Sequence, residues 1–395
     1  MRRPWNDDTK LMHVAIKGYT PTAEARPRSN LVLLIDTSGS MQAANKLPLL
    51  IQSFKLLLNT LDEDDTVAIV SYAGSAGTVL EPTPANKKSI IREALDRMEA
   101  GGSTAGGAGL KLAYAKADEN FDPDAVNRII LATDGDFNVG FRTADEMGDF
   151  IERKRKSGVF LSVLGFGQGN YQDNVMQALA QKGNGTAAYI DTLQEARKVL
   201  ADEAGGALIP IAKDVKIQVE FNPNQVAEYR LLGYETRALN REDFNNDAVD
   251  AGEIGSGHTV TALYEITPVG SAAILVDPLR YGATPTKQVQ ASPRGEYAFV
   301  KVRFKRPDEQ VSELLTQAVT AADETGSLVQ SPREAQFAAS VAAFGQLLRG
   351  GTGTKGYNYD DVIALASRAK GADEFGYRAE FIELVRLAEA LDDDQ

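Results

Sequence analysis

Residues 31–40 have the sequence Leu-Val-Leu-Leu-Ile-Asp-Thr-Ser-Gly-Ser, in which an unbroken apolar run passes directly into small polar residues. The run Leu31–Ile35 is short, rich in branched side chains and ends at turn residues, which is typical of a strand buried on both faces of a parallel sheet. A second run of this kind, Ile129–Ala132, ends two residues before Asp134. Open α/β sheets bind ligands beyond the carboxyl ends of their strands, so Asp36 and Asp134 are predicted to share one edge of a sheet.

The surrounding sequence alternates between buried strands and amphipathic helices. Expected strands cover residues 31–36, 65–72, 127–133, 159–165 and 186–190, and expected helices cover residues 46–61, 87–98, 108–120, 143–156, 172–182 and 193–203. This alternation predicts a doubly wound α/β domain over residues 30–205.

The remaining sequence predicts two further regions. Apolar and polar residues alternate in short segments over residues 206–322, which indicates an antiparallel β-sandwich. Within it, residues 312–319 fit a helix on pattern alone, whereas the family resemblance described below favours a last strand there. Residues 323–395 are expected to form a C-terminal helical region. Its last helix has an apolar stripe that contains Phe381, Leu384, Val385, Ala388 and Leu391.

The N-terminal residues 1–29 contain one isolated strand, predicted at residues 11–19. A lone strand leaves its backbone hydrogen-bonding groups unpaired, so it needs a sheet to join. We expect it to join the β-sandwich, which would make the α/β domain an insertion into that sandwich.

Three separated segments carry side-chain oxygens at the expected strand ends: Asp36-Thr37-Ser38-Gly39-Ser40, Thr104 in a glycine-rich loop, and Asp134-Gly135-Asp136. They resemble the metal-ion-dependent adhesion site of von Willebrand factor type A domains, which consists of Asp-x-Ser-x-Ser, a distant Thr and a distant Asp. The stretches at residues 101–104, 133–138 and 243–247 further resemble the bacterial YfbK-type branch, often described as the calcium-activated chloride channel homologue family. The resemblance extends over almost the whole chain.

The resemblance implies a role for each motif residue. Ser38 and Ser40 would ligate a divalent cation directly, and Thr104 would add a third protein oxygen in the ligand-bound state. Asp36 and Asp134 would act mostly through water. The cation would be Mg²⁺, or alternatively Mn²⁺ or Ca²⁺, and the partner would be a protein that presents Asp or Glu.

Other interpretations of these segments remain open. The sequence Asp-Thr-Ser-Gly-Ser alone also fits a turn or a helix N-cap. The loop Asp243–Asp250 has oxygen ligands at alternate positions, but Ala248 and Ile254 depart from the EF-hand template, so a polar loop is favoured over a calcium site. The glycine-rich residues 101–109 lack the Gly-Lys-Ser/Thr ending of a phosphate-binding loop.

The favoured function is a non-enzymatic, metal-dependent protein-binding module of the adhesion type, and two alternative functions stay open. A metal-dependent hydrolase or phosphoryl-transfer enzyme is compatible with acidic residues around Mg²⁺, although a Ser–His–Asp triad would need His13 or His258 to reach the serines. The other alternative is a structural cell-envelope protein whose metal site is vestigial.

Composition excludes several classes of partner. The 42 basic and 55 acidic residues give a net charge of −13, which would repel nucleic acid and anionic membranes. A transmembrane helix needs about 20 consecutive apolar residues, and no apolar run in this sequence approaches that length. Cysteine is absent, and residues 1–7 do not resemble a signal peptide. Members of the resembling family commonly carry an export signal, often of lipoprotein type, so we expect a periplasmic or extracellular location in the cell envelope.

Overall fold

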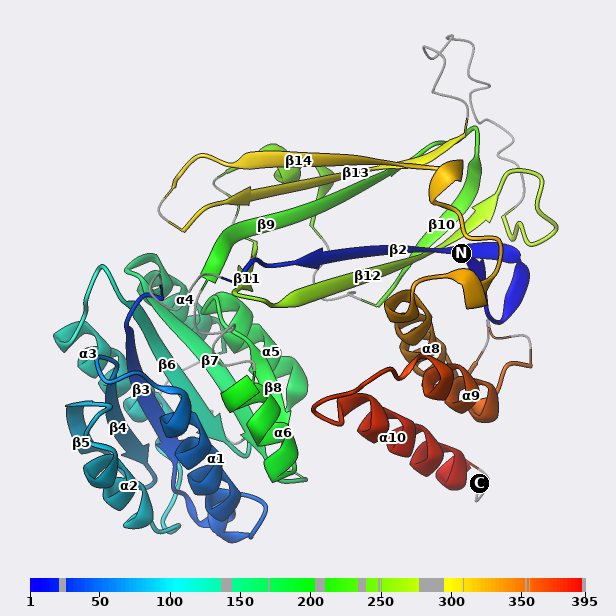
Figure 1. Cartoon of the computed structure of the whole chain (residues 1–395). Coiled ribbons are helices and arrows are strands. Elements are labelled where there is room, and N and C mark those ends of the chain that lie inside the picture. Colours follow the sequence, from blue (N-terminus) through cyan, green and yellow to red (C-terminus); the bar gives the residue numbers. More distant parts are fainter. Residues whose placement is uncertain are drawn as a thin grey trace.

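The computed structural model describes residues 1–20, 26–135, 144–169, 171–202, 210–233, 239–247, 249, 251–276, 295–307, 309–351, 354 and 356–392. Over these residues it contains a six-stranded sheet covered by helices, two four-stranded antiparallel sheets and a set of C-terminal helices (Figure 1).

The six-stranded sheet has the strand order β5-β4-β3-β6-β7-β8. Five of its strands are parallel to one another: β3 (Ser29–Asp36), β4 (Thr66–Tyr72), β6 (Val126–Thr133), β7 (Val159–Phe166) and β8 (Ala187–Ile190). β3 and β6 are central neighbours, and Ile35 pairs with Ala132. Asp36 therefore lies level with the end of β6, and Asp134 follows at the same edge of the sheet.

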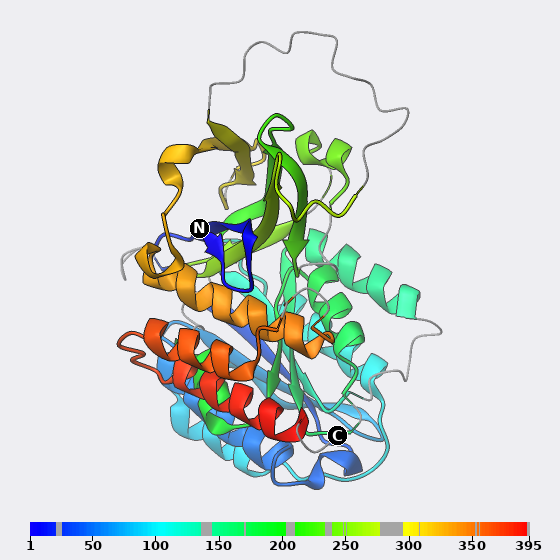
Figure 2. The ribbon, with the colours of Figure 1, turned by 90° about the vertical axis from the view of Figure 1, so that its right-hand side faces the viewer.

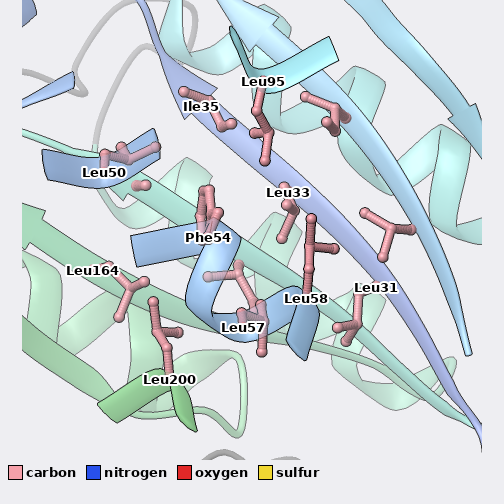
Figure 3. Close-up of a cluster of buried hydrophobic side chains, with 14 of the residues drawn as sticks. Leu31, Leu33, Ile35, Leu50, Phe54, Leu57, Leu58, Leu95, Leu164 and Leu200 are labelled. Carbon is pink, nitrogen blue, oxygen red and sulfur yellow. The ribbon is translucent and has the colours of Figure 1, made fainter. Parts of the chain in front are cut away.

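Helices cover both faces of this sheet, which explains the unbroken apolar runs. On β3, the side chains of Leu31, Leu33 and Ile35 belong to a core cluster with residues of helices α1 (Leu47–Thr60), α2 (Lys88–Asp96) and α6 (Leu193–Arg197) (Figure 3). Val32 and Leu34 belong to the opposite cluster, with α3 (Gly106–Glu119), α4 (Ala144–Lys156) and α5 (Asp173–Lys182). Successive strand residues point to opposite faces, so a strand between two helical layers has no polar face.

Two details of this region differ from the sequence prediction. β5 (Ala76–Pro84) runs antiparallel to β4 at the edge of the sheet and was not predicted. It contains Pro82 and Pro84, which edge strands tolerate and which weaken a strand pattern. The helix expected at residues 193–203 is α-helical only to Arg197, and Lys198–Asp202 continues it as π-helical turns.

The N-terminal strand pairs outside the six-stranded sheet. β2 (Asn6–Lys17) runs antiparallel to β12 (Thr259–Pro268), with Lys17 opposite Thr259 and Lys10 opposite Ile266. Together with β1 (Arg2–Arg3) and β10 (Val226–Leu232), they form a sheet of order β1-β2-β12-β10. The polypeptide of the six-stranded sheet thus lies, in sequence, between two paired strands.

The second antiparallel sheet has the order β11-β9-β13-β14. Its strands are β11 (Gly252–Gly255), β9 (Pro210–Phe221), β13 (Glu296–Lys305) and β14 (Glu313–Thr320). The strand that the family resemblance favours at residues 312–319 is therefore confirmed, and the helical alternative is wrong. Side chains of the two antiparallel sheets meet where Phe221 of β9 stacks on Tyr229 of β10, with ring centroids 4.1 Å apart.

The C-terminal helices pack against the sheet that contains β2. A buried cluster joins Trp5 and Leu11 to side chains of α8 (Arg333–Leu348), α9 (Tyr359–Ala369) and α10 (Tyr377–Asp392). Figure 2 shows α8, α9 and α10, coloured from orange to red, side by side. The turn before α10 also touches α6, where Gln194 Nε2 donates to the carbonyl of Phe375 at 3.4 Å.

The predicted apolar stripe of the last helix is correct only in part. Val385 is buried and Phe381 packs on Phe337 and Phe344, but Leu384 and Leu391 are more than half exposed. α10 buries only the narrow side that carries Phe381, Ile382 and Val385, so its second row of leucines faces outward.

The buried cluster allows a local stability test, because Trp5 is the only tryptophan of the chain and lies within it. Leu11→Ala is expected to lower the free energy of unfolding by about 2–5 kcal/mol, since it leaves a cavity in a packed core. Urea unfolding followed by tryptophan fluorescence would measure the change. Leu384→Ala removes the same atoms from an exposed position and should change stability by no more than about 0.5 kcal/mol. Equal effects of the two substitutions would contradict this packing.

Candidate metal centre

The turn after β3 brings two serine hydroxyls together. The backbone N–H of Ser38 donates to Asp36 Oδ1 at 2.9 Å, and the N–H of Thr37 donates to the carbonyl of Tyr72 at 2.9 Å. These two bonds fold the chain tightly as it leaves the strand. As a result, the hydroxyl oxygens of Ser38 and Ser40 lie 3.1 Å apart. Ser38 is buried and Ser40 is exposed, so the pair extends from the edge of the sheet to solvent.

The glycine-rich loop is fastened to the same turn by two backbone hydrogen bonds. Gly101 N–H donates to the carbonyl of Thr37 at 2.8 Å, and Gly39 N–H donates to the carbonyl of Gly102 at 3.0 Å. Gly102 has φ +82°, a conformation that favours glycine. Thr104 follows two residues later and is half-buried. The two bonds join the loop to the serine turn at residues two and three positions before Thr104, which favours a structural role for these glycines over a phosphate cradle.

Asp36 is a buried carboxylate surrounded by donors. Its Oδ2 accepts hydrogen bonds from the hydroxyls of Thr133 at 3.0 Å and Tyr72 at 3.2 Å, while its Oδ1 accepts from Ser38 N–H. Burial raises the pKa of Asp36, and the hydrogen bonds from Ser38 and Thr133 oppose that rise. The neighbouring Asp134 carboxylate raises it further. Asp36 is therefore placed to shape the turn and to supply negative charge.

Asp134 is the second buried carboxylate, and one of its oxygens is unsatisfied. Its Oδ2 accepts from the Lys46 ammonium at 2.8 Å. Its Oδ1 is buried without a hydrogen-bond partner among the described residues. A buried charged oxygen without a protein partner is costly, so this oxygen suits a bound cation or a hydrogen-bond donor. Asp136, the next acidic residue, lies outside the described residues.

This donor set fits a small, hard divalent cation. Mg²⁺ prefers six oxygens at about 2.1 Å, which places adjacent ligands of an octahedron about 3 Å apart. The distance of 3.1 Å between the hydroxyls of Ser38 and Ser40 matches such an edge. Within the described ranges, no three His, Asp or Glu side chains are grouped closely enough to hold a metal ion on their own. A cation at this edge would therefore depend on the serine and threonine hydroxyls.

Sequence reasoning missed three residues of this region: Tyr72, Thr133 and Lys46. Tyr72 and Thr133 end the strands that flank β3, so the rule that ligands gather at strand ends could have indicated them. Burial and the Asp36 carboxylate hold the pKa of Tyr72 well above its usual value, which keeps its hydroxyl a donor. Lys46 directly precedes α1, and nothing in its local sequence indicates a contact with Asp134.

The acidic loop 243–247 is already neutralised by cationic side chains. The Lys216 ammonium donates to the carbonyls of Asp243 at 3.2 Å and Asn246 at 2.5 Å, and Lys305 donates to the carbonyl of Asp247 at 2.9 Å. Hydrogen bonds from Ser312 and from Arg303 lower the pKa of Asp247 to about 2. These lysines occupy carbonyl oxygens that a calcium ion would need, which favours the polar-loop interpretation. Ala248 and Asp250 lie outside the described residues.

The two histidines belong to the antiparallel sheet. His13 lies on β2 opposite Leu263 of β12, and His258 directly precedes β12. Burial lowers the pKa of His13. Both histidines are thus part of, or next to, a different sheet from the one that carries Ser38 and Ser40 at its edge. Among the helices that the structure describes, none combines the length and the apolar character that crossing a bilayer requires.

Comparison with known proteins finds a matching family model for each half of the chain. The von Willebrand factor type A domain model matches residues 30–202, and the model described as Uncharacterized protein YfbK, C-terminal, matches residues 206–391. Uncharacterized protein YfbK from Escherichia coli strain K12 is 45% identical over 391 residues, which cover 99% of this chain and 67% of the relative. The chain belongs to the YfbK family.

Other relatives share parts of this organisation. Uncharacterized protein sll0103 from Synechocystis is 31% identical over 196 residues, which cover 47% of this chain and 43% of the relative. The solved structure of a von Willebrand factor type A protein from Catenulispora acidiphila has a TM-score of 0.50 at 17% identity, and the match covers 93% of this chain and 85% of that one. This likeness shows the fold alone. Von Willebrand factor type A domains are in general metal-dependent modules for protein–protein interaction.

Substitution of two buried tyrosines tests the hydrogen bonding around Asp36. Tyr72→Phe removes one donor from the buried carboxylate and is expected to lower the free energy of unfolding by about 1–3 kcal/mol. Tyr114→Phe is the matched control, because the Tyr114 hydroxyl is buried without a partner among the described residues, so its loss should be neutral or stabilising. Urea unfolding followed by circular dichroism measures both variants, and a larger loss for Tyr114→Phe would contradict this assignment.

Proposed function

We propose that this chain is a metal-dependent protein-binding module of the adhesion type. Ser38, Ser40 and Thr104 bind a divalent cation, Asp36 and Asp134 supply negative charge around it, and the cation accepts a carboxylate from Asp or Glu of a partner protein. Mg²⁺ is the cation best suited to this donor set, with Mn²⁺ or Ca²⁺ as alternatives. The observation that carries the proposal is the hydroxyl pair, 3.1 Å apart, beside buried carboxylates at one sheet edge.

The hydrogen bonds of Asp36 and the ion pair of Asp134 support recognition of an acidic partner. Asp36 accepts hydrogen bonds from three donors, and one oxygen of Asp134 is held by Lys46. The negative charge of both carboxylates is partly taken up by these donors, so it neutralises the cation only in part. The ion therefore keeps a net attraction for another anionic oxygen. Ser40 is exposed, so a partner's side chain can approach from solvent.

The charge of the chain makes the cation necessary for such an interaction. A net charge of −13 repels acidic partners in general. Binding of an Asp or Glu side chain at this edge then requires a local positive charge, which the divalent ion supplies. Removal of the ion is expected to abolish binding rather than weaken it slightly.

We further propose a domain division and a location. Residues 1–29 and 206–322 form one β-sandwich unit, residues 30–205 are inserted into it, and residues 323–395 form a helical region. The pairing of β2 with β12 and the contact of Phe221 with Tyr229 support the shared sandwich. A periplasmic or extracellular location in the cell envelope is the one expected from the family resemblance.

A peptide-selection experiment tests the binding function. Random peptides selected on the protein in Mg²⁺ should contain an essential Asp or Glu, and EDTA should release them. Ser40→Ala should lose this binding while keeping its native circular dichroism spectrum, because it removes one direct ligand. Ser75→Ala, an exposed serine in the turn before β5, is the matched control and should bind like the wild type.

Two outcomes would contradict the proposal. Peptides that bind equally well in EDTA, or after replacement of Asp by Asn, would exclude recognition through the cation. Hydrolysis of phosphate or ester substrates in Mg²⁺ or Mn²⁺ that is lost in Ser40→Ala would favour the enzyme alternative.

A further inference from the structure

Lys46 makes an unusual contact for a candidate cation site, because its ammonium lies on one of the carboxylates. Lys46 Nζ is 2.8 Å from Asp134 Oδ2, and the Asp134 side chain is 0% exposed. Only 11% of the Lys46 side chain is exposed, although lysine usually extends into solvent. The contact is therefore an ion pair shielded from water, rather than a chance meeting of surface groups.

The route of the Lys46 side chain is built into the fold. Its aliphatic carbons lie over Gly167, which follows β7 and has φ +77°. A Cβ at Gly167 would clash with Lys46 Cε and would lie 2.6 Å from its Cγ. The carbonyl of Gly167 accepts a hydrogen bond from the Tyr189 hydroxyl at 2.9 Å, which fixes the backbone beneath the lysine. The residues that follow β7 and end β8 thus lie along the path of the lysine side chain toward Asp134.

We propose that Lys46 is a tethered competitor of the divalent cation, and that it makes tight cation binding depend on the partner's carboxylate. This inference rests on the proposed function and identifies the residue that couples its two ligands. An ammonium has three donors and no acceptor, so it cannot ligate a metal ion and can only compete for the oxygens of Asp134.

A count of charges explains the coupling. Asp36 and Asp134 contribute two negative charges, a divalent ion contributes two positive charges, and Lys46 adds one more. The site with its ion therefore carries one excess positive charge in a place with little water to screen it. A carboxylate from the partner removes that excess. Without Lys46, the charges of the ion and of the two aspartates would sum to zero. The partner's carboxylate would then have no excess positive charge to neutralise.

The competition has a second consequence for Asp134. Because Lys46 holds Oδ2, only Oδ1 remains free to face the cation, directly or through a water molecule. The ion then depends more on the neutral hydroxyls of Ser38 and Ser40. Neutral ligands leave more positive charge on the metal, which favours an anionic ligand from a partner.

The direct test is Mn²⁺ binding to the whole chain by isothermal titration calorimetry, without any partner. Lys46→Met is expected to bind Mn²⁺ about tenfold or more tightly than the wild type, because it removes the competing charge. Lys46→Arg keeps the charge and should bind like the wild type. Lys46→Gln keeps a hydrogen-bond donor without charge and should behave like Lys46→Met, so it replaces that variant if Lys46→Met fails to fold.

A double substitution shows whether the effect passes through Asp134. Asp134→Asn in the Lys46→Met background should cancel most of the gain in Mn²⁺ affinity, since the two residues act on each other. The inference is overturned if folded Lys46→Met and Lys46→Gln bind Mn²⁺ no more tightly than the wild type. In that case a wild type that binds Mn²⁺ leaves the proposed function intact. Absence of Mn²⁺ binding in all variants overturns the proposed function, and the role of Lys46 with it.

Discussion

The parallel pairing of β3 with β6 is the constraint on which the rest of the site depends. All residues of both strands are buried, and the side chains of β3 alternate between two separate core clusters. A shift in pairing by one residue would exchange the two sets and disrupt both clusters, so the register is strongly specified. Because the register is fixed, Asp36 and Asp134 leave the sheet together, and the serine turn forms between β4 and the glycine-rich loop.

Two carboxylates that lie so close together in a buried place repel each other, and the surrounding residues compensate for this. Three donors satisfy Asp36, and an ammonium satisfies half of Asp134. These contacts offset the repulsion, and they leave one oxygen of Asp134 without a protein partner among the described residues. Under the proposed function, the same residues that stabilise the fold would also limit how strongly the site attracts a cation. In this account, affinity for the metal and affinity for a partner are not independent properties.

The sequence predicts the parts of this structure that depend on local pattern. Strands buried on both faces appear as unbroken apolar runs. The strand expected at residues 11–19 corresponds to β2 (Asn6–Lys17), and the partner strand that it is expected to need is β12. Features that depend on distant neighbours are not predictable in this way. β5 is an edge strand held mainly by β4, α10 buries only one narrow side, and Lys46 reaches Asp134 across a glycine more than a hundred residues away in sequence. The motif residues were identifiable because their spacing from strand ends is local, whereas their charged neighbour was not.

The most direct test of the metal centre is anomalous X-ray diffraction from crystals grown in Mn²⁺. The account predicts a single strong anomalous peak at the carboxyl edge of β3 and β6, with the hydroxyl oxygens of Ser38 and Ser40 about 2.2 Å from it. A peak at the loop 243–247 instead, or no peak near the two serines in a crystal saturated with Mn²⁺, would contradict it.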